Sequence, residues 1–352
     1  MSGPPMLSGQ HRFDEFMSEA LYGSSGFYTG GGRAGRRGDF ITSPEVGPLF
    51  GAVVARACDA WWEQLGCPDD FRIIDAGAGP GTLARSVLAA SPRCLGAAPG
   101  RYLAIEISEP QRAQHPDGVT SLASLHEVPD GAVGIVIANE LLDNLPFRLA
   151  VYDGSWREAY VERATDRWTE RLSPFSTVPV VMPAEAPHGA RAPIQEAAAE
   201  WVKQAVGKLS AGRVVVIDYA SALTATLCLS PWREWLRTYR GHERGSHYLD
   251  APGSQDITTQ VCVDQLVAAV GQPDAVRSQA QFLGLWGIDE LVDEGRRVWN
   301  EQAARPGLEA MRARSRLREA EALLDPHGLG GFTVLEWAVN PGVAVEPTIT
   351  GA

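Results

Sequence analysis

A glycine-rich segment has the residue types that could hold a nucleotide-like ligand. It reads DAGAGPG from Asp75 to Gly81 and follows a short apolar stretch. Glycines allow a tight turn and let a ligand come close to the backbone. In open α/β sheets, ligands bind beyond the carboxyl ends of the strands. We therefore expect Asp75, Gly77, Gly79 and Gly81 to contact a bound cofactor.

The spacing of these glycines discriminates between two kinds of cofactor. The dinucleotide fingerprint G-x-G-x-x-G requires glycine at position 82, where this chain has Thr82. Pro80 also removes an amide N–H that a pyrophosphate would use. The uncharged sulfur and amino-acid end of S-adenosylmethionine depends less on that donor. The loop therefore favours S-adenosylmethionine over a dinucleotide, and a purely structural turn stays an alternative.

Acidic residues follow two further apolar stretches. Glu106 ends the stretch 101–106, where a carboxylate can accept hydrogen bonds from both hydroxyls of a ribose. The stretch 133–138 runs into Asn139, and Glu140 and Asp143 follow three residues apart. These two carboxylates share a face if the segment turns helically. Such a pair suits a guanidinium, which no base deprotonates at neutral pH, and it equally suits an ordinary helix N-terminus.

The alternation of apolar strands and helices predicts the fold that positions these residues. We expect strands at 71–75, 101–106, 133–138, 213–219 and 332–339, a hairpin within 147–172, and helices at 81–90, 193–209 and 308–324. This rhythm indicates an α/β fold with a doubly wound, mostly parallel sheet. The expected division is an N-terminal helical segment with a loop (1–66), the core (67–221), a helical lid insertion (222–300), and a C-terminal helix and strand completing the core (301–345).

Composition narrows the class of function. The 352 residues carry a formal net charge of −12, which argues against nucleic acid as the main partner. The five cysteines and seven histidines show no metal-ligand spacing, so we expect no metal site. No apolar run reaches the roughly 20 residues of a membrane span. The N-terminal residues show no signal or transit pattern, so we expect a cytoplasmic protein.

Several segments together resemble the MidA family of methyltransferases. Residues 38–46 read GDFITSPEV, similar to the family's G-D-F-x-T-S-P-E, and residues 139–146 read NELLDNLP, similar to its N-E-F-F-D-A-L-P. Later similar segments are IDY at 217–219, LRTYRGH at 236–242 and PGSQDIT at 252–258. The resemblance extends over roughly residues 22 to 335.

The resemblance implies a class I methyltransferase core that uses S-adenosyl-L-methionine. It places further cofactor-binding residues in the matching segments, namely Tyr28, Gly38, Thr42, Ser43 and Asn139. It also makes Glu140 and Asp143 the catalytic pair. The mitochondrial member of the family methylates an arginine of a respiratory complex subunit, so a protein arginine is the leading acceptor.

Two other functions stay open at this point. A small-molecule methyltransferase could use Trp232, Trp235 and Trp286 to line an apolar pocket. An assembly factor could bind S-adenosylmethionine with little turnover. Gln260 and Cys262 stand where the family usually has histidine and aspartate, which bears on the acceptor. The acceptor, the number of methyl groups and the oligomeric state are left open, with a homodimer as one option.

Overall fold

The structure is a computed structural model of the chain, and it describes residues 9–29, 42–96, 100–164, 167–240, 243–305 and 307–341. The chain forms two compact units, each assembled from three separate stretches of sequence. Unit 1 comprises residues 1–42, 140–203 and 218–272, and unit 2 comprises residues 43–139, 204–217 and 273–352. The division into four consecutive segments that we expect from the sequence stays a prediction.

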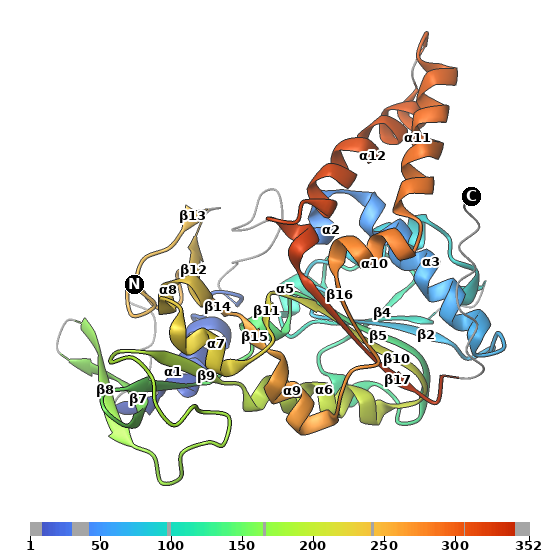
Figure 1. The fold of residues 1–352 in the computed structure, drawn as a ribbon. Coiled ribbons are helices and arrows are strands. Elements are labelled where there is room, and N and C mark those ends of the chain that lie inside the picture. Colours follow the sequence, from blue (N-terminus) through green and yellow to red (C-terminus); the bar gives the residue numbers. More distant parts are fainter. Residues whose placement is uncertain are drawn as a thin grey trace. The chain divides into compact units, whose positions relative to one another are not determined.

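Unit 2 is built on a seven-stranded sheet with the order β16-β17-β10-β5-β2-β3-β4 (Figure 1). The strands are β2 (Arg72–Ala76), β3 (Tyr102–Ile105), β4 (Val119–Leu122), β5 (Ala132–Asn139), β10 (Leu209–Asp218), β16 (Ala275–Ser278) and β17 (Thr333–Val339). Neighbouring strands from β4 to β10 pair in parallel, and β16 is antiparallel to β17. The predicted α/β fold with a doubly wound, mostly parallel sheet is therefore confirmed.

The direction in which successive strands are added reverses between β2 and β5. From β2 the sheet grows through β3 to β4, and from β5 it grows the other way to β10. The register places Ala76 opposite both Ile105 and Ala138, and Asn139 opposite Ile217. The carboxyl ends of these strands thus meet at one edge of the sheet. This is the place where open α/β sheets bind ligands.

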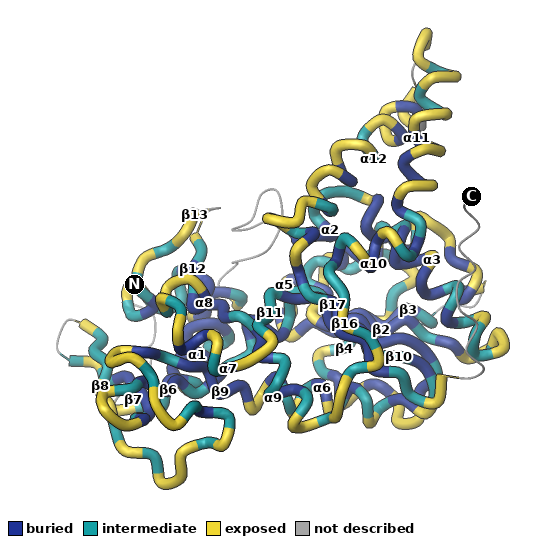
Figure 2. The backbone as a smooth tube through the Cα atoms, viewed as in Figure 1, coloured by how far each residue is buried: buried dark blue, intermediate teal, exposed yellow. Residues whose placement is uncertain are grey.

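Helices of unit 2 pack on this sheet and on one another. They are α2 (Ser43–Val46), α3 (Pro48–Gln64), α4 (Thr82–Ala89), α5 (Glu109–Arg112), α10 (Gln279–Leu285), α11 (Ile288–Gln302) and α12 (Leu308–Leu324). The long helix α3 buries Phe50, Val54 and Trp61, as their helical spacing predicts. Figure 2 shows the central strands buried, whereas α11 and α12 carry much exposed backbone.

Two glycines allow β5 and β10 to approach each other and β2. Gly134 and Gly212 are register partners, with φ of 150° and 135°. A Cβ atom on Gly134 would overlap the backbone of Arg72, including its carbonyl oxygen. A Cβ atom on Gly212 would overlap the carbonyl oxygen of Gly134. A side chain at either position would therefore force the central strands apart.

We expect Gly134→Ala to lower the free energy of unfolding by about 3 kcal/mol or more, because rigid backbone atoms of Arg72 would have to move. Urea denaturation followed by circular dichroism measures the effect. Gly207→Ala is the matched control, since an added Cβ there meets nothing within 4 Å. Gly207 lies in helix α6 (Glu196–Lys208), where alanine is preferred over glycine. Equal stability of the two variants would contradict the prediction.

Unit 1 contains a five-stranded antiparallel sheet. Its strands are β1 (Gln10–Arg12), β6 (Arg148–Tyr152), β7 (Trp156–Ala164), β8 (Arg167–Pro174) and β9 (Arg191–Ile194), in the order β1-β7-β6-β9 with β8 also pairing with β7. The hairpin expected within 147–172 is present as β6 and β7. Helix α1 (Phe13–Tyr22) buries Phe13, Phe16 and Met17 in a core shared with Phe147. The N-terminal segment 1–66, expected from the sequence to be helical, therefore contains this helix.

The region 222–300 contains strands that the sequence analysis missed. Strands β12 (Leu236–Arg240), β13 (Glu243–Arg244) and β14 (Asp256–Thr259) form a three-stranded antiparallel sheet. Strand β15 (Val261–Cys262) pairs with β11 (Ala220–Ser221), which lies just before this region. The helices of unit 1 here are α7 (Thr224–Leu229), α8 (Trp232–Trp235) and α9 (Val263–Val270). The expectation of helices and loops alone was wrong. The strands were missed because they are short and bury polar threonines. Apolar and polar residues therefore do not alternate along them as they do in a typical half-buried strand.

Candidate functional site

The glycine loop lies in unit 2 and connects β2 to α4. Gly77, Gly79 and Gly81 have φ of 71°, 52° and 83°, which is the left-handed region that favours glycine. The amides of Gly77 and Ala78 donate to the carbonyl oxygen of Ile105, at 2.9 and 3.0 Å. These bonds tie the loop to the end of β3. The sequence therefore places glycine where the backbone conformation demands it.

Glu106 is bonded directly to this loop. Its Oε2 accepts from the amide of Gly79 at 3.0 Å, and its Oε1 accepts from the amide of Ser108 at 2.7 Å. Burial raises the pKa of Glu106, and the two amides oppose that rise. The carboxylate is thus held at a fixed place beside the loop, and each oxygen keeps a second lone pair. That arrangement fits the hydroxyls of a ribose.

Asp75 is a buried residue of β2, just before the loop. Its Oδ2 accepts from the hydroxyl of Tyr102 at 2.9 Å. Burial raises the pKa of Asp75 to about 7, and the charge of Glu106 adds to the rise. Asn139 ends β5 at the same edge of the sheet. Asp75, the three glycines, Glu106 and Asn139 therefore lie together in unit 2, in an arrangement that fits a nucleoside with an amino-acid tail.

The residues of the signature segment 38–46 have different places. Gly38 lies outside the described residues. Ser43 donates from its buried hydroxyl to Oε1 of Gln279 at 2.8 Å. Glu45 accepts from the hydroxyl of Thr82 at 2.5 Å, at the start of α4 just after the glycine loop. Thr42 is buried. The described part of the signature supports the loop through Glu45, and contact of Thr42 and Ser43 with a cofactor stays a prediction.

Glu140 and Asp143 lie in unit 1, in the segment that follows β5. Glu140 has φ of 51°, an uncommon conformation for a residue with a side chain. Asp143 lies in a short 3₁₀ helix, η3 (Leu142–Asn144), and its Oδ2 accepts from the hydroxyl of Thr258 at 2.5 Å. The other oxygen, Oδ1, is buried and has no hydrogen-bond partner among the described residues. A ligand that donates hydrogen bonds would satisfy it.

Asp218, at the end of β10, holds the segment of Asp143 in place. Its Oδ2 accepts from the amides of Leu142 and Asp143 at 3.0 and 3.2 Å, and its Oδ1 accepts from the amide of Tyr219 at 2.8 Å. The Asp218 side chain is thus surrounded by backbone donors. Asp218 therefore anchors the backbone of the residue that carries the Asp143 carboxylate.

A fourth acidic side chain, Asp256, is bonded to Asn144 of η3. Its Oδ1 accepts from Nδ2 of Asn144 at 3.0 Å and lies 3.2 Å from the hydroxyl of Tyr28. The same hydroxyl lies 3.1 Å from Oδ1 of Asn144. Tyr28, which we expect to bind the cofactor, is therefore bonded inside unit 1 next to the acidic residues, and its contact with a cofactor stays a prediction.

Burial raises the pKa of every aspartate in this group. The pKa of Asp143 rises to about 6, although the bond from Thr258 and the nearby amides of Asn144 and Asp143 oppose the rise. The pKa of Asp256 rises to about 7, with the charge of Asp143 as a second cause. The pKa of Asp218 is also raised, by burial first and then by the charges of Asp143 and Glu140. The group therefore favours a positively charged ligand.

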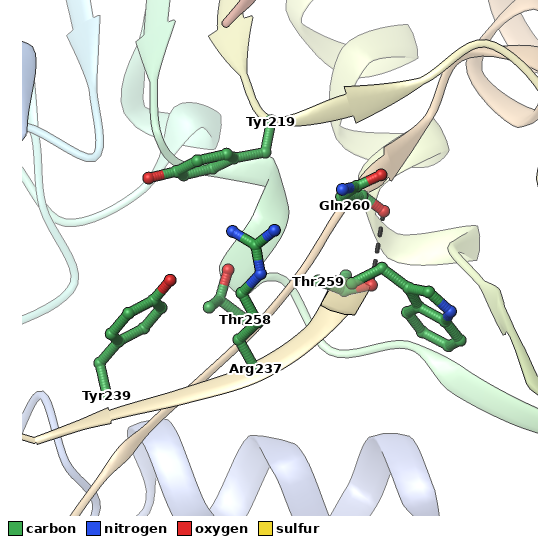
Figure 3. Close-up of a pocket in the computed structure, with 7 residues that line it drawn as sticks. Tyr219, Arg237, Tyr239, Thr258, Thr259 and Gln260 are labelled. Atoms are coloured by element: carbon green, nitrogen blue, oxygen red, sulfur yellow. Dashed lines mark hydrogen bonds between the residues drawn. The ribbon is translucent and has the colours of Figure 1, made fainter. Parts of the chain in front are cut away.

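A pocket adjoins these carboxylates in unit 1 (Figure 3). It contains about 180 Å³ of space free of protein atoms, part of it open to solvent. Its lining residues are Tyr219, Trp235, Arg237, Tyr239, Thr258, Thr259 and Gln260. Thr258 joins the pocket to Asp143 through the bond described above. Of the three tryptophans proposed for an apolar pocket, Trp235 lines this one. Trp232 packs on Tyr248, and Trp286 packs on Trp61.

Sequence reasoning missed several members of this group. Asp218, Asp256 and Thr258 belong to segments that carry the family resemblance, yet their chemistry was not assigned. The signal for Asp218 was its place at the end of an expected strand, as for Glu106. No comparable signal marks Arg237, because a single arginine in a short strand reads as a surface residue.

The described residues hold no group of three His, Cys, Asp or Glu side chains that could bind a metal ion. Within the same ranges, no helix has the length and apolar character needed to cross a membrane.

The chain is similar to proteins of known family. Residues 53–280 match the family model Methyltransf_28, which describes S-adenosyl-L-methionine-dependent methyltransferases. Protein arginine methyltransferase NDUFAF7 of Homo sapiens is 26% identical over 78% of this chain and 69% of that protein. The homolog of NDUFAF7 in Drosophila melanogaster is 31% identical over 45% of this chain and 43% of that protein, so this alignment spans less than half of either chain.

A solved structure shares the fold over nearly the whole chain. A COG1565 superfamily member from Burkholderia thailandensis, bound to S-adenosyl-homocysteine, has a TM-score of 0.80 and 24% identity, covering 97% of this chain and 91% of that one. A second crystal structure of a COG1565 protein from the same organism has a TM-score of 0.75.

The comparisons also correct one expectation. The cytoplasmic location expected from the sequence was wrong, because the curated relatives that match are named as mitochondrial proteins. The family model covers well over half of the chain, and it agrees with the glycine loop and the parallel sheet. The chain belongs to this MidA-type family of S-adenosyl-L-methionine-dependent methyltransferases.

Proposed function

We propose that this methyltransferase transfers the methyl group to an arginine nitrogen of a protein. The observation that carries the proposal is the group of four acidic side chains in unit 1, Glu140, Asp143, Asp218 and Asp256. Three of them are almost fully buried, and burial raises their pKa values. Neighbouring carboxylates raise the pKa values of Asp218 and Asp256 further. A guanidinium would supply the positive charge that such a group favours and a hydrogen-bond donor for Oδ1 of Asp143.

The cofactor is assigned to residues of unit 2. The glycine loop and Asp75 would hold the amino-acid end, and Glu106 the ribose, with Ser43 and Asn139 as further contacts. The family resemblance adds three candidate contacts from unit 1, namely Tyr28, Gly38 and Thr42. When bound, S-adenosylmethionine supplies a methyl group on a positively charged sulfur, ready for transfer to a nucleophile.

The acidic residues have two tasks toward an arginine. Its guanidinium keeps its proton at neutral pH, so the carboxylates of Glu140 and Asp143 would hold the planar fork and draw positive charge away from the attacking nitrogen. The nitrogen must lose one proton after it has taken up the methyl group. Asp143, with a pKa near 6, can accept that proton close to neutral pH.

The names of the relatives support a protein acceptor. Several are called protein arginine methyltransferase. A subunit of a respiratory complex, as the family resemblance implies, is the first candidate substrate within this proposal. A homodimer is a further part of it, which light scattering of the purified protein would test.

Methyl-label transfer tests the proposal. Purified protein is mixed with labelled S-adenosylmethionine and with lysate of cells lacking this gene, and mass spectrometry identifies the labelled species. We expect methylarginine in a protein, and we expect Glu140→Gln to reduce the label by about 100-fold or more. Glu185→Gln, at an exposed position of the same unit, is the control and should leave the label unchanged.

Other outcomes redirect the assignment. If the label appears in the small-molecule fraction, the acceptor is a small cationic molecule and not a protein. Cofactor binding without label in any fraction would favour an assembly factor with little turnover. Either result would contradict arginine methylation.

A further inference from the structure

Arg237 lies inside the pocket that adjoins the acidic residues. Figure 3 shows its guanidinium among Tyr219, Tyr239 and Thr258, pointing into the space that these residues line. Its central carbon, Cζ, is 5.5 Å from the centre of the Tyr219 ring, which is a cation–π distance. The pocket therefore already contains the chemical group that the proposed acceptor would bring.

Arg237 makes few polar contacts for a partly buried arginine. Its Nε donates to the carbonyl oxygen of Glu234 at 2.6 Å. Within the described residues it forms no ion pair with a carboxylate within 4.0 Å. By contrast, Arg191 in the same unit binds both oxygens of Glu170 and stacks on Trp232. The side chain of Arg237 can thus leave its place without breaking a bidentate pair.

The charge of Arg237 nevertheless acts on the acidic residues. It lowers the pKa of Asp143, against the larger effect of burial. Oδ1 of Asp143 stays without a hydrogen-bond partner among the described residues even with Arg237 in the pocket. Arg237 therefore balances charge from a distance, and it leaves the buried acceptor atom for another donor.

We propose that the pocket around Tyr219 and Tyr239 is a guanidinium site that Arg237 occupies until an acceptor arginine replaces it. The inference rests on the proposed function, because it takes the acceptor to be an arginine. Two guanidinium groups repel each other, so the acceptor and Arg237 compete for the pocket and for the face of the Tyr219 ring. Arg237 would lower the affinity for every cation, and most of all for one that cannot also satisfy Asp143.

Binding of a small arginine ligand tests this inference without turnover. The probe is Nα-acetyl-arginine amide, titrated into the full chain by calorimetry in the presence of S-adenosyl-homocysteine. Arg237→Met keeps the length of the side chain and removes its charge, and we expect it to bind the probe about tenfold more tightly than the wild type. Nα-acetyl-citrulline amide, which has the same shape without the charge, should gain no affinity.

Arg240→Met is the matched control. Arg240 lies on the same strand, β12, but is exposed and does not line the pocket. Its replacement should leave the affinity for the probe unchanged. Thermal melting checks that each variant is folded. If Arg237→Met does not fold, Arg237→Lys keeps the charge but loses the planar fork, and it should bind the probe more tightly than the wild type by a smaller factor.

Unchanged or weaker binding in a folded Arg237→Met variant would overturn the inference, even if the protein methylates arginine. The same gain of affinity in Arg240→Met would also overturn it, because the effect would then reflect overall charge. Tighter binding in Arg237→Met alone would support the inference even if label transfer finds no methylarginine, so the two proposals fail separately.

Discussion

Replacing Asp143 by asparagine is expected to reduce methyl transfer by about 100- to 1,000-fold while S-adenosylmethionine still binds. Asparagine has the size of aspartate and can keep the bond to Thr258, but it lacks the charge that would hold a guanidinium and accept its proton. The measurement is the rate of label transfer at saturating cofactor, together with the cofactor affinity from calorimetry. Asp153→Asn, at the exposed β6–β7 turn, is the control.

The pH dependence gives this prediction a second readout. With a pKa near 6, Asp143 is neutral in mildly acidic solution and cannot balance a cation. We expect kcat/KM of the wild type to rise with pH through about 6, and we expect this rise to be reduced in Asp143→Asn. Asp218 and Glu140 interact with the same site, so the rise belongs to the group.

Stability separates a chemical defect from a folding defect. The pKa of Asp143 is higher in the folded protein than the usual value of about 3.9 in an unfolded chain. The stability that this group contributes is therefore fully present below about pH 4 and is lost as the pH rises through about 6. Asp143→Asn should melt at the same or a higher temperature than the wild type at pH 7. A variant that is folded and fully active would contradict the catalytic role.

Replacing Glu106 by glutamine is expected to weaken binding of S-adenosyl-homocysteine by about 10- to 100-fold. The carboxylate of Glu106 accepts from the amides of Gly79 and Ser108. A glutamine NH₂ would face one of these donors, so the variant would lose a fixed acceptor for the ribose and would also disturb the glycine loop. Calorimetric titration measures the change.

Glu109→Gln provides the comparison for Glu106. Glu109 begins α5, three residues further along the chain, and its side chain is exposed. The affinity of this variant should equal that of the wild type. Equal affinity in Glu106→Gln as well would remove Glu106 from the cofactor site. It would leave the glycine loop as the main support for the assignment.

The fold of unit 2 could be predicted from sequence because its signals are local. β2 and β5 are short runs of apolar residues, and β2 leads into a loop whose glycines have positive φ. The same reasoning found Glu106, because it ends such a run. At these positions the residue type matches the backbone conformation and the burial of the site. The local pattern is therefore enough to predict the strands and the loop.

The acidic group of unit 1 could be predicted only in part. Glu140 and Asp143 are close in sequence, whereas Thr258 is 115 residues from the carboxylate to which it donates. Strands β12 and β14 bury threonines instead of alternating with apolar residues, so no periodicity marks them. Their pairing is a tertiary effect, and contacts between distant segments leave no trace in a single sequence.

The interleaving of the two units has a consequence for how this protein is made. The chain passes between the units five times, after residues 42, 139, 203, 217 and 272, so no single cut separates them. The sheet of unit 2 receives β16 and β17 only from the last 80 residues. During synthesis the earlier strands of this sheet therefore lack these two neighbours until residues 273–352 have been made. Such distant pairings are slow to form, and they leave an edge of the partly made sheet unpaired in the meantime.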